Sequence, residues 1–512
     1  MAVPALLALW LKGENRKRAA HVLLAVASAF VAFFFFKLIA DPSQLGRASV
    51  KMGVDQAELP LRLNTCFQVG TQMLIKSAAG GKPGEASADT ESAARSAETF
   101  AKAVGALEKA VAAAPELPLL KAKLIVLLAT RNHESDRKQL ESLISQLKSP
   151  QPLNASAVML GSQLEQIYIK KDRAYLSEHV KTIATDLSRQ IPPSWYLDSV
   201  LSHLYEASGS RSLLEEHQSK LDQRYMNMLI RFLFMTLVAI GSGFIGLIVI
   251  LIQFGHLSRV KQQLPDAVGL NVPWKSIYIV FIGWFTTQLL GSFSLNEATK
   301  ALNLGANRDA LTTAVVTTLT YLLVNLPALA YIYYFALKER GLSFKQALNL
   351  RLRTSSSGPI KLIFAGYLGW CAALPIVATT AFLASRYLGT QGSENPVLAQ
   401  VMQASSSANL LAVLLFYLTL GVIAPLCEEI LFRGFFYAAF RNKIGVPLSI
   451  IASSALFAVM HFDKSGAPML FVIGVVCAYM YERTRSLIPS IITHGLWNSG
   501  TFTMALILFG TR

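Results

Sequence analysis

Long apolar runs recur along this chain, separated by short polar loops and by one large polar region. A helix needs about 20 predominantly apolar residues to cross the roughly 30 Å hydrocarbon core of a bilayer. The runs that predict spans are His21–Ala40, Met228–Phe254, Ile277–Leu295, Leu311–Leu337, Leu362–Phe382, Leu410–Phe440, Val446–His461, Met469–Tyr481 and Leu487–Phe509. One run, Met469–Tyr481, is short for a span, so about eight or nine spans are predicted. The predicted fold class is therefore an all-α, polytopic transmembrane bundle.

The polar region, residues 41–225, has a helical pattern of its own, with apolar residues three to four positions apart. The predicted helices are Ala97–Ala114, Leu117–Thr130, Arg137–Leu147, Ala155–Lys170, Tyr175–Ile191 and Ser194–Ala207. Proline or glycine separates most of them. Residues 106–115 resemble the second helix of a tetratricopeptide repeat, without a second copy at the expected period of about 34 residues. A generic helical domain and a tetratricopeptide-like domain therefore both stay open.

Charge refines this picture. Only 15% of the 512 residues are charged and 53% are hydrophobic, against about 25% charged in soluble proteins. The net charge of +16 comes from basic residues beside the apolar runs, which indicates membrane topology rather than nucleic-acid binding. The loop charges predict a cytoplasmic N-terminus, and the first run is predicted to be a signal anchor. A bacterial inner membrane is the predicted location, with an endoplasmic membrane as the alternative.

These patterns divide the chain into four parts. Residues 1–40 are the cytoplasmic N-terminus and anchor, and residues 41–225 are an extracytoplasmic helical domain inserted after the first span. Residues 226–360 contain transmembrane helices and a cytoplasmic basic loop, and residues 361–512 contain the ionisable cluster described next. The helical domain shows no catalytic constellation, so a protein partner is predicted for it. Its histidines are expected to be solvated: His133, His179, His203 and His217.

Two adjacent glutamates, Glu428 and Glu429, interrupt the apolar run Leu410–Phe440. A charge in hydrocarbon costs roughly 2.5–3.5 kcal/mol on insertion scales, so the pair needs compensation. Arg433 follows four residues after Glu429 and five after Glu428, so all three can face one side of a helix. One interpretation is a functional site inside the membrane. The other is a structural ion pair that locks two helices together.

Three further polar residues follow in later apolar runs: His461, His494 and Asn498. A buried carboxylate can take a proton from water, while imidazole and amide groups orient water or stabilise negative charge. Asn498 lies one turn after His494, and Phe457 lies one turn before His461, where it would form a wall of the pocket. The combination predicts amide hydrolysis by activated water. The alternatives are a solvated His461 and an interhelical hydrogen-bond pair of His494 with Asn498.

These residues resemble the three-motif signature of the CPBP family. That family includes the type II CAAX prenyl endopeptidases and the bacterial bacteriocin-processing and immunity (Abi-like) proteins. The motifs are Glu428-Glu429-x-x-x-Arg433, Phe457-x-x-x-His461 and His494-x-x-x-Asn498. Their order, spacing and apolar context agree over about residues 362–509. The resemblance implies a CPBP-type intramembrane peptidase domain in residues 361–512; the anchor and residues 41–225 are not part of the common pattern.

The resemblance also implies a role for each residue of the first motif. Glu428 would be the catalytic base that activates water. Glu429 and Arg433 would shape the site and balance its charge.

The other two motifs would act on the substrate. By the same resemblance, His461 would contact the water or the substrate, and His494 with Asn498 would polarise the scissile carbonyl. The family is described both as metalloproteases and as metal-independent glutamate proteases. Glu428, His461 and His494 are therefore a predicted three-ligand set if a divalent metal such as zinc binds. The chain has no His-Glu-x-x-His motif, which disfavours a standard zinc protease.

The predicted function is an intramembrane endopeptidase that works within the lipid bilayer. Its substrate would be a membrane-associated peptide or protein, including a lipidated one. Two alternatives stay open. One is a non-catalytic membrane scaffold or immunity protein of the same fold. The other is a proton-coupled transporter, which is disfavoured because no inverted internal repeat is apparent.

Overall fold

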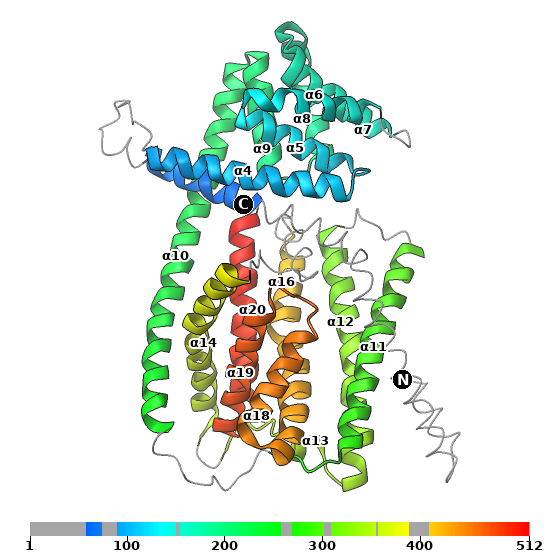
Figure 1. Ribbon diagram of the computed structural model, residues 1–512, viewed down its shortest axis with the longest axis vertical. Coiled ribbons are helices and arrows are strands. Elements are labelled where there is room, and N and C mark those ends of the chain that lie inside the picture. Colours follow the sequence, from blue (N-terminus) through cyan, green and yellow to red (C-terminus); the bar gives the residue numbers. More distant parts are fainter. Residues whose placement is uncertain are drawn as a thin grey trace. The chain divides into compact units, whose positions relative to one another are not determined.

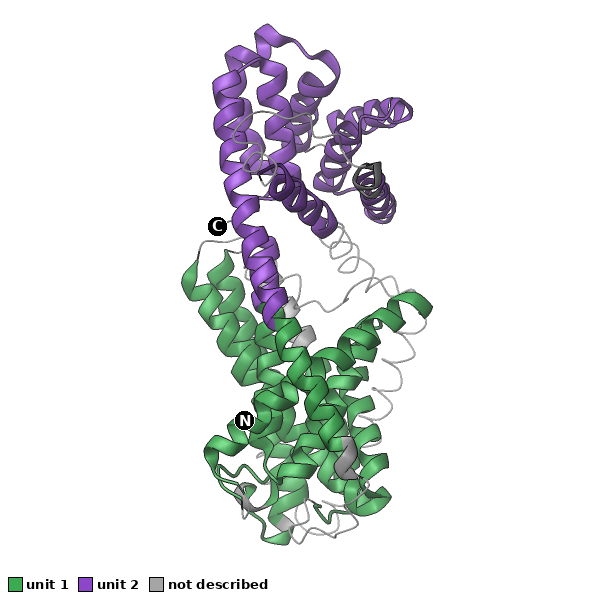
Figure 2. Cartoon of the chain, turned by 90° about the vertical axis from the view of Figure 1, so that its left-hand side faces the viewer, with its two compact units in different colours: residues 1–42, 239–395, 409–502 green, residues 43–238, 396–408, 503–512 purple. Residues whose placement is uncertain are grey.

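The structure is a computed structural model that describes residues 58–73, 90–149, 154–257, 269–301, 309–354, 357–388 and 409–510. Within these ranges every regular element is a helix, as the apolar pattern predicts. The chain divides into two compact units, drawn in different colours in Figure 2. Unit 1 comprises residues 1–42, 239–395 and 409–502, and unit 2 comprises residues 43–238, 396–408 and 503–512. The predicted anchor His21–Ala40 lies outside the described residues.

Unit 2 is a series of helices in which each packs on the next (Figure 1). Residues 58–73 are helical. After them come α4 (Thr90–Ala113), α5 (Pro118–Arg131), η1 (Glu134–Asp136), α6 (Arg137–Lys148), α7 (Ala155–Glu165), η2 (Gln166–Lys170), α8 (Arg173–Gln190) and α9 (Trp195–Ser208). All six helices predicted for this region are present, and α4 begins earlier than the predicted Ala97. The tetratricopeptide likeness and the extracytoplasmic position stay predictions.

Short polar side chains set the boundaries of these helices. The Asn154 side chain accepts a hydrogen bond from the backbone of Ala157 at the start of α7. Asp172 and Ser194 cap α8 and α9 in the same way, which satisfies amide groups that have no partner within the helix. Gly209 ends α9 at φ 70°, a left-handed conformation that glycine adopts without steric cost.

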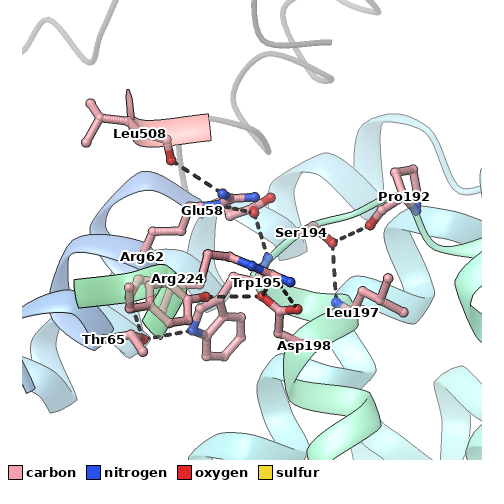
Figure 3. Close-up of polar contacts among 12 residues, drawn as sticks. Glu58, Arg62, Thr65, Pro192, Ser194, Trp195, Leu197, Asp198, Arg224 and Leu508 are labelled. Atoms are coloured by element: carbon pink, nitrogen blue, oxygen red, sulfur yellow. Dashed lines mark hydrogen bonds and ion pairs between the residues drawn. The ribbon is translucent and has the colours of Figure 1, made fainter. Parts of the chain in front are cut away.

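A buried polar cluster joins distant segments of unit 2 (Figure 3). One carboxylate oxygen of Glu58 accepts hydrogen bonds from Arg62 Nε at 2.7 Å and from the backbone nitrogen of Trp195 at 2.8 Å. Glu58 therefore places a negative charge at the N-terminus of α9, where the helix dipole favours it. Arg62 also donates to the backbone oxygen of Leu508 at 3.4 Å. The cluster thus ties residues from three separate parts of the sequence together.

Burial also shifts the acid–base behaviour of unit 2. Burial raises the pKa of Asp198, although Arg224 donates to its carboxylate at 3.0 Å. Burial lowers the pKa of His203, whose Nδ1 lies 3.0 Å from the Tyr168 hydroxyl. His217 also has a partner, the backbone oxygen of Asp198. Both side chains are half-buried and have a protein partner, so neither is simply solvated as expected.

Unit 1 holds the apolar helices (Figure 1). They are α11 (Trp274–Ala301), α12 (Ala310–Ile332), α13 (Phe344–Ala347), α14 (Pro359–Tyr387), α16 (Leu410–Leu418), α17 (Ala424–Glu429), α18 (Ala438–Val459) and α19 (Ala467–Thr484), with η3 (Tyr333–Leu337), η4 (Lys338–Arg340), η5 (Thr419–Ile423) and η6 (Ile430–Tyr437) between them. Two helices, α10 (Arg211–Leu257) and α20 (Leu487–Phe509), have residues in both units. In unit 1, α12 packs between α11 and α16, and α19 packs between α14 and α18.

Four helical stretches of the described chain are long and apolar enough to cross a membrane. They are Arg211–Gln253, Ala310–Leu337, Pro359–Tyr387 and Leu410–Val459. Three other predicted spans correspond to the helices α11, α19 and α20, which are not among these four. The count of eight or nine spans and the orientation of the termini therefore stay predictions.

The stretch Leu410–Val459 is not one straight helix. Gly445 has φ 75° and ψ 173°, a conformation that only glycine adopts readily. This break falls between the two runs predicted as separate spans, Leu410–Phe440 and Val446–His461. It divides the stretch into a segment that carries the glutamates and a segment that leads to His461.

Candidate active site

The two glutamates lie in an irregular part of their helix. Two π-helical segments, η5 and η6, flank the short helix α17. The two glutamates lie at the C-terminal end of α17. π-Helical segments are rare and are frequent at functional sites, because they rotate side chains out of the regular α-helical series. Pro425, which has no N–H to donate, lies at the start of α17. The local backbone therefore departs from a regular α-helix where the ionisable pair sits.

Glu429 and Arg433 form a fully buried ion pair, as their four-residue spacing predicts. Arg433 Nη1 lies 2.7 Å from Glu429 Oε1, and both side chains are 0% exposed. Arg433 Nη2 donates to the backbone oxygen of Gly474 in α19 at 3.0 Å. The guanidinium carbon also lies 4.6 Å from the ring centroid of Phe457 in α18, within the range of a cation–π contact. Arg433 therefore connects its own helix to α18 and α19 as well as neutralising Glu429.

Glu428 has different surroundings. Its side chain is 16% exposed, and its Oε1 accepts a hydrogen bond of 2.6 Å from the hydroxyl of Tyr321 in α12. The other oxygen, Oε2, has no hydrogen-bond partner among the described residues. It lies 4.0 Å from His461 Nε2 and 3.7 Å from His494 Nε2. Glu428 is therefore the carboxylate that faces both histidines.

Each histidine is oriented through its Nδ1 atom. His461 follows the end of α18, and its Nδ1 lies 2.7 Å from the backbone oxygen of Phe457. His494 lies in α20, and its Nδ1 lies 2.9 Å from Glu429 Oε1. The Phe457 ring contacts both imidazoles, with centroid distances of 4.7 Å and 5.5 Å. Phe457 thus packs against both imidazoles, and its role as a wall of a substrate pocket stays a prediction.

The partners of the Nδ1 atoms fix which nitrogen carries the proton. A backbone carbonyl and an ionised carboxylate only accept hydrogen bonds, so both Nδ1 atoms are assigned as N–H donors. In the neutral imidazoles of His461 and His494, Nε2 then carries a lone pair. Three acceptors consequently face one another: the two Nε2 atoms and Glu428 Oε2. A hydrogen-bond donor placed among these three atoms would satisfy all of them.

The expectation for Asn498 needs a correction. Its amide nitrogen donates to the backbone oxygen of Leu420 in η5 at 3.0 Å, so one of its two N–H groups joins α20 to the glutamate helix. This matches the interhelical hydrogen bond that was the structural alternative, except that the partner is Leu420 and not His494. The second N–H of Asn498 is the part of the amide that can still serve a substrate.

Two glycines allow α20 to approach the glutamate helix closely. A Cβ atom at Gly495 would clash with the backbone oxygen of Gly421, and one at Gly421 would meet the Ser499 side chain. Small residues at such crossings let two helix backbones come together within a membrane. Gly495 follows His494 directly in the sequence. The close crossing therefore holds His494 against Glu429.

The predicted metal ligands do not form a recognisable metal site. Within the described part of the chain, no group of three or more His, Cys, Asp or Glu side chains is arranged so that it could hold a metal ion. The chemistry of the three facing acceptors suits zinc, but their arrangement does not fit it. The zinc ligand set Glu428, His461 and His494 stays a prediction.

Sequence reasoning missed the contribution of α12. Tyr321 reaches Glu428, and Thr318, one turn earlier, lies 2.7 Å from the hydroxyl of Thr419 in η5. Asn325, one turn later, donates to the backbone oxygen of Tyr321. These three polar residues recur at helical spacing in a run that also contains several other threonines, and that spacing was the available signal.

Comparisons with known proteins point to the same part of the chain. Residues 410–500 match a family model described as "Type II CAAX prenyl endopeptidase Rce1-like", which confirms the resemblance predicted for the C-terminal region. The match includes all six predicted site residues and excludes Tyr321. No solved structure shows a significant match to the chain.

Curated relatives match stretches of comparable length. "Putative membrane peptidase YdiL" of Bacillus subtilis (strain 168) is 27% identical over 95 residues, which are 19% of this chain and 39% of the relative. "UPF0177 protein YxdF" of Lactococcus lactis subsp. lactis (strain IL1403) is 32% identical over 80 residues, 15% of this chain and 44% of the relative. "UPF0177 protein YaiH" of the same strain is 34% identical over 109 residues, 21% of this chain and 44% of the relative. The chain thus spans less than half the length of these relatives. The apolar helices together with this similarity identify an integral membrane protein.

Proposed function

We propose that this chain is an intramembrane endopeptidase in which Glu428 activates a water molecule. The observation that carries the proposal is the meeting of Glu428 Oε2 with the Nε2 atoms of His461 and His494, at 4.0 Å and 3.7 Å. A water molecule there donates one O–H to the carboxylate and the other to an imidazole. Its lone pairs then point away from the three acceptors and toward a substrate carbonyl. The similarity of residues 410–500 to prenyl endopeptidases supports a peptide bond as the target.

The proposed reaction has two proton transfers. Glu428 takes one proton from water while the water oxygen bonds to the carbonyl carbon, which leaves a negative charge on the carbonyl oxygen. The second N–H of Asn498 stabilises that charge. Glu428 then returns the proton to the leaving nitrogen as the C–N bond breaks, which gives a carboxylic acid product and an amine.

The contacts support different tasks for the two glutamates. Glu429 shares one oxygen between Arg433 and His494 and is fully buried. It is therefore suited to balance charge and to orient His494. Glu428 keeps one oxygen free of protein donors and is partly exposed, so it is suited to exchange a proton with water.

The proposed substrates are membrane-anchored peptides, because Glu428 lies in a helical stretch apolar enough to span a bilayer. The test uses the purified full chain in lipid nanodiscs. It offers prenylated, acylated and unlipidated transmembrane peptides and detects cleavage by mass spectrometry. The unchanged chain should cleave at least one class, and Glu428→Gln should cleave none. Cleavage by Glu428→Gln would refute the assignment of the base.

The runner-up function is a membrane scaffold of the same fold, supported by the large helical unit 2. In that role no peptide class is cleaved, and any cellular phenotype survives Glu428→Gln. We further propose that unit 2 binds a protein partner, which cross-linking of the full chain in membranes tests. The zinc prediction is tested by metal analysis. One zinc per chain that disappears in both His461→Ala and His494→Ala would support a metalloprotease.

A further inference from the structure

We propose that Arg485 and Arg441 form a binding site for the phosphate of an anionic lipid headgroup, at the C-terminal end of α19. The site lies within unit 1 and shares no residue with the candidate active site, so it does not depend on peptide cleavage. Its basis is a pair of guanidinium groups that share a single carboxylate, that of Glu482.

Glu482 has little acceptor capacity left for Arg485. One of its oxygens, Oε2, accepts from the Tyr437 hydroxyl at 2.8 Å and from Arg441 Nε at 2.9 Å. The other, Oε1, accepts from Arg441 Nη2 at 2.9 Å and lies 3.1 Å from Arg485 Nη1. A carboxylate offers about four lone-pair sites, and Arg441 takes two of them in the favoured bidentate geometry. Glu482 therefore compensates Arg441 more fully than Arg485.

Arg485 keeps hydrogen-bond donors that the protein does not satisfy. Its Nε and Nη1 atoms are buried and form no hydrogen bond with the described residues, so its contact with Glu482 is an ion pair alone. Two guanidinium groups share one carboxylate, which leaves a net positive charge. A largely buried charge without a full set of partners is unfavourable. The Arg485 side chain is 13% exposed, so an anion at the surface can reach it and complete its compensation.

The backbone of Arg485 gives an independent reason to look for a task of its side chain. Arg485 ends α19 at φ 59° and ψ 23°, in the left-handed conformation. Glycine is the usual residue at such helix ends, because it adopts this conformation without steric cost. Other residues are strained there, and strained residues cluster at ligand-binding sites.

A second basic segment lies beside Arg485. The Ser486 hydroxyl donates to the backbone oxygen of Arg351 at 2.6 Å, and the backbone nitrogen of Leu487 donates to the backbone oxygen of Asn349 at 3.2 Å. The Arg351 side chain is exposed. The two hydrogen bonds therefore bring a further arginine to the turn that carries Arg485.

These features fit a phosphate group at a membrane surface. The segment that contains Arg351 closely precedes α14, which is long and apolar enough to cross a membrane. Basic pockets between membrane helices hold anionic lipid headgroups. A guanidinium presents a planar fork of N–H donors that matches two phosphate oxygens. Free inorganic phosphate offers the same oxygens, so the experiment compares the two sources.

The test is native mass spectrometry of the full chain in detergent micelles, titrated with phosphatidylglycerol, with phosphatidylcholine or with inorganic phosphate. The variants are Arg485→Gln, Arg485→Gly and, as the matched control, Arg483→Gln. Arg483 is exposed and lies two residues earlier, so its replacement changes the net charge by the same amount. Arg485→Gly removes the guanidinium and leaves a residue that the left-handed conformation does not strain.

We expect the unchanged chain to bind phosphatidylglycerol about tenfold more tightly than phosphatidylcholine or inorganic phosphate. Both Arg485 variants should bind it about tenfold more weakly than the unchanged chain does, and Arg483→Gln should stay within about twofold. An equal loss in Arg483→Gln would indicate a general attraction to basic residues and overturn the proposal. Normal binding by Arg485→Gly would also overturn it, because the loss in Arg485→Gln would then be a folding defect. Inorganic phosphate that binds as tightly as phosphatidylglycerol would overturn the assignment to a lipid.

Discussion

Replacing Glu429 should damage folding much more than replacing Glu428. Glu429→Gln keeps the size of the side chain but removes the negative charge beside Arg433. Both side chains are 0% exposed, and the two charged atoms lie 2.7 Å apart. Breaking a buried ion pair by removing one partner costs about 3–5 kcal/mol, because the remaining charge is left uncompensated. His494 also loses its charged acceptor. We therefore expect Glu429→Gln to lower the free energy of unfolding by about 3–5 kcal/mol.

Glu428→Gln should behave differently. The Glu428 side chain is 16% exposed, and its basic neighbours within the described part of the chain are the two histidines. The carbonyl oxygen of glutamine can still accept the hydrogen bond from Tyr321. The change in the free energy of unfolding should therefore stay within about 1 kcal/mol, while peptide cleavage is lost.

The assay is equilibrium unfolding of the full chain in mixed micelles, followed by the fluorescence of its tryptophans. The double variant Glu429→Gln/Arg433→Met supplies the decisive control, because it removes both charges of the pair. It should recover most of the loss seen in Glu429→Gln, since replacing a whole buried pair by apolar groups is often neutral. Equal stabilities of the two single variants, or a double variant whose loss is the sum of its parts, would refute the reasoning.

Two further predictions use other contacts. Gly495→Ala should reduce peptide cleavage about a hundredfold, because the added Cβ clashes with the Gly421 backbone and displaces His494; Gly500→Ala, with open space around it, should leave cleavage unchanged. Burial lowers the pKa of His203 in the folded chain. The neutral imidazole therefore contributes its full stabilisation above the ordinary histidine pKa of about 6.5, and this stabilisation is lost as the pH falls through the lower pKa of the folded state. Hydrogen exchange of α7 to α9, compared at pH 7.5 and about pH 5, should show this acid loosening in the unchanged chain and not in His203→Gln.

Local patterns made much of the fold predictable. The helices of unit 2 follow from apolar spacing and from breaks such as the one at Gly209, which are properties of neighbouring residues. The Glu429–Arg433 pair follows from a four-residue spacing. The contact of Phe457 with His461 follows from its place one turn before that histidine. Each of these features depends on residues that are close in sequence or matched by a known motif.

Contacts between distant helices were not predictable in the same way. Tyr321 and Glu428 are 107 positions apart, and the sequence does not specify which helix packs beside the glutamates. The acceptor that Arg433 finds in α19 is a backbone oxygen, which leaves no trace in residue type. The acceptor of the Asn498 amide is likewise a backbone oxygen, that of Leu420 in η5. π-Helical segments likewise have no periodic signature that distinguishes them from α-helix.

In the reaction proposed above, the arrangement of acceptors would let one site both hold water and later stabilise negative charge. While Glu428 is ionised and His461 and His494 are neutral, all three groups accept, so a water molecule is favoured between them. A proton that leaves this water goes to one of the same three atoms. That atom changes from acceptor to donor when the carbonyl oxygen of the substrate gains its charge. The proton transfer from water thus creates the hydrogen-bond donor that is needed once the carbonyl oxygen is charged. The buried Glu429–Arg433 pair keeps His494 aligned before and after this transfer.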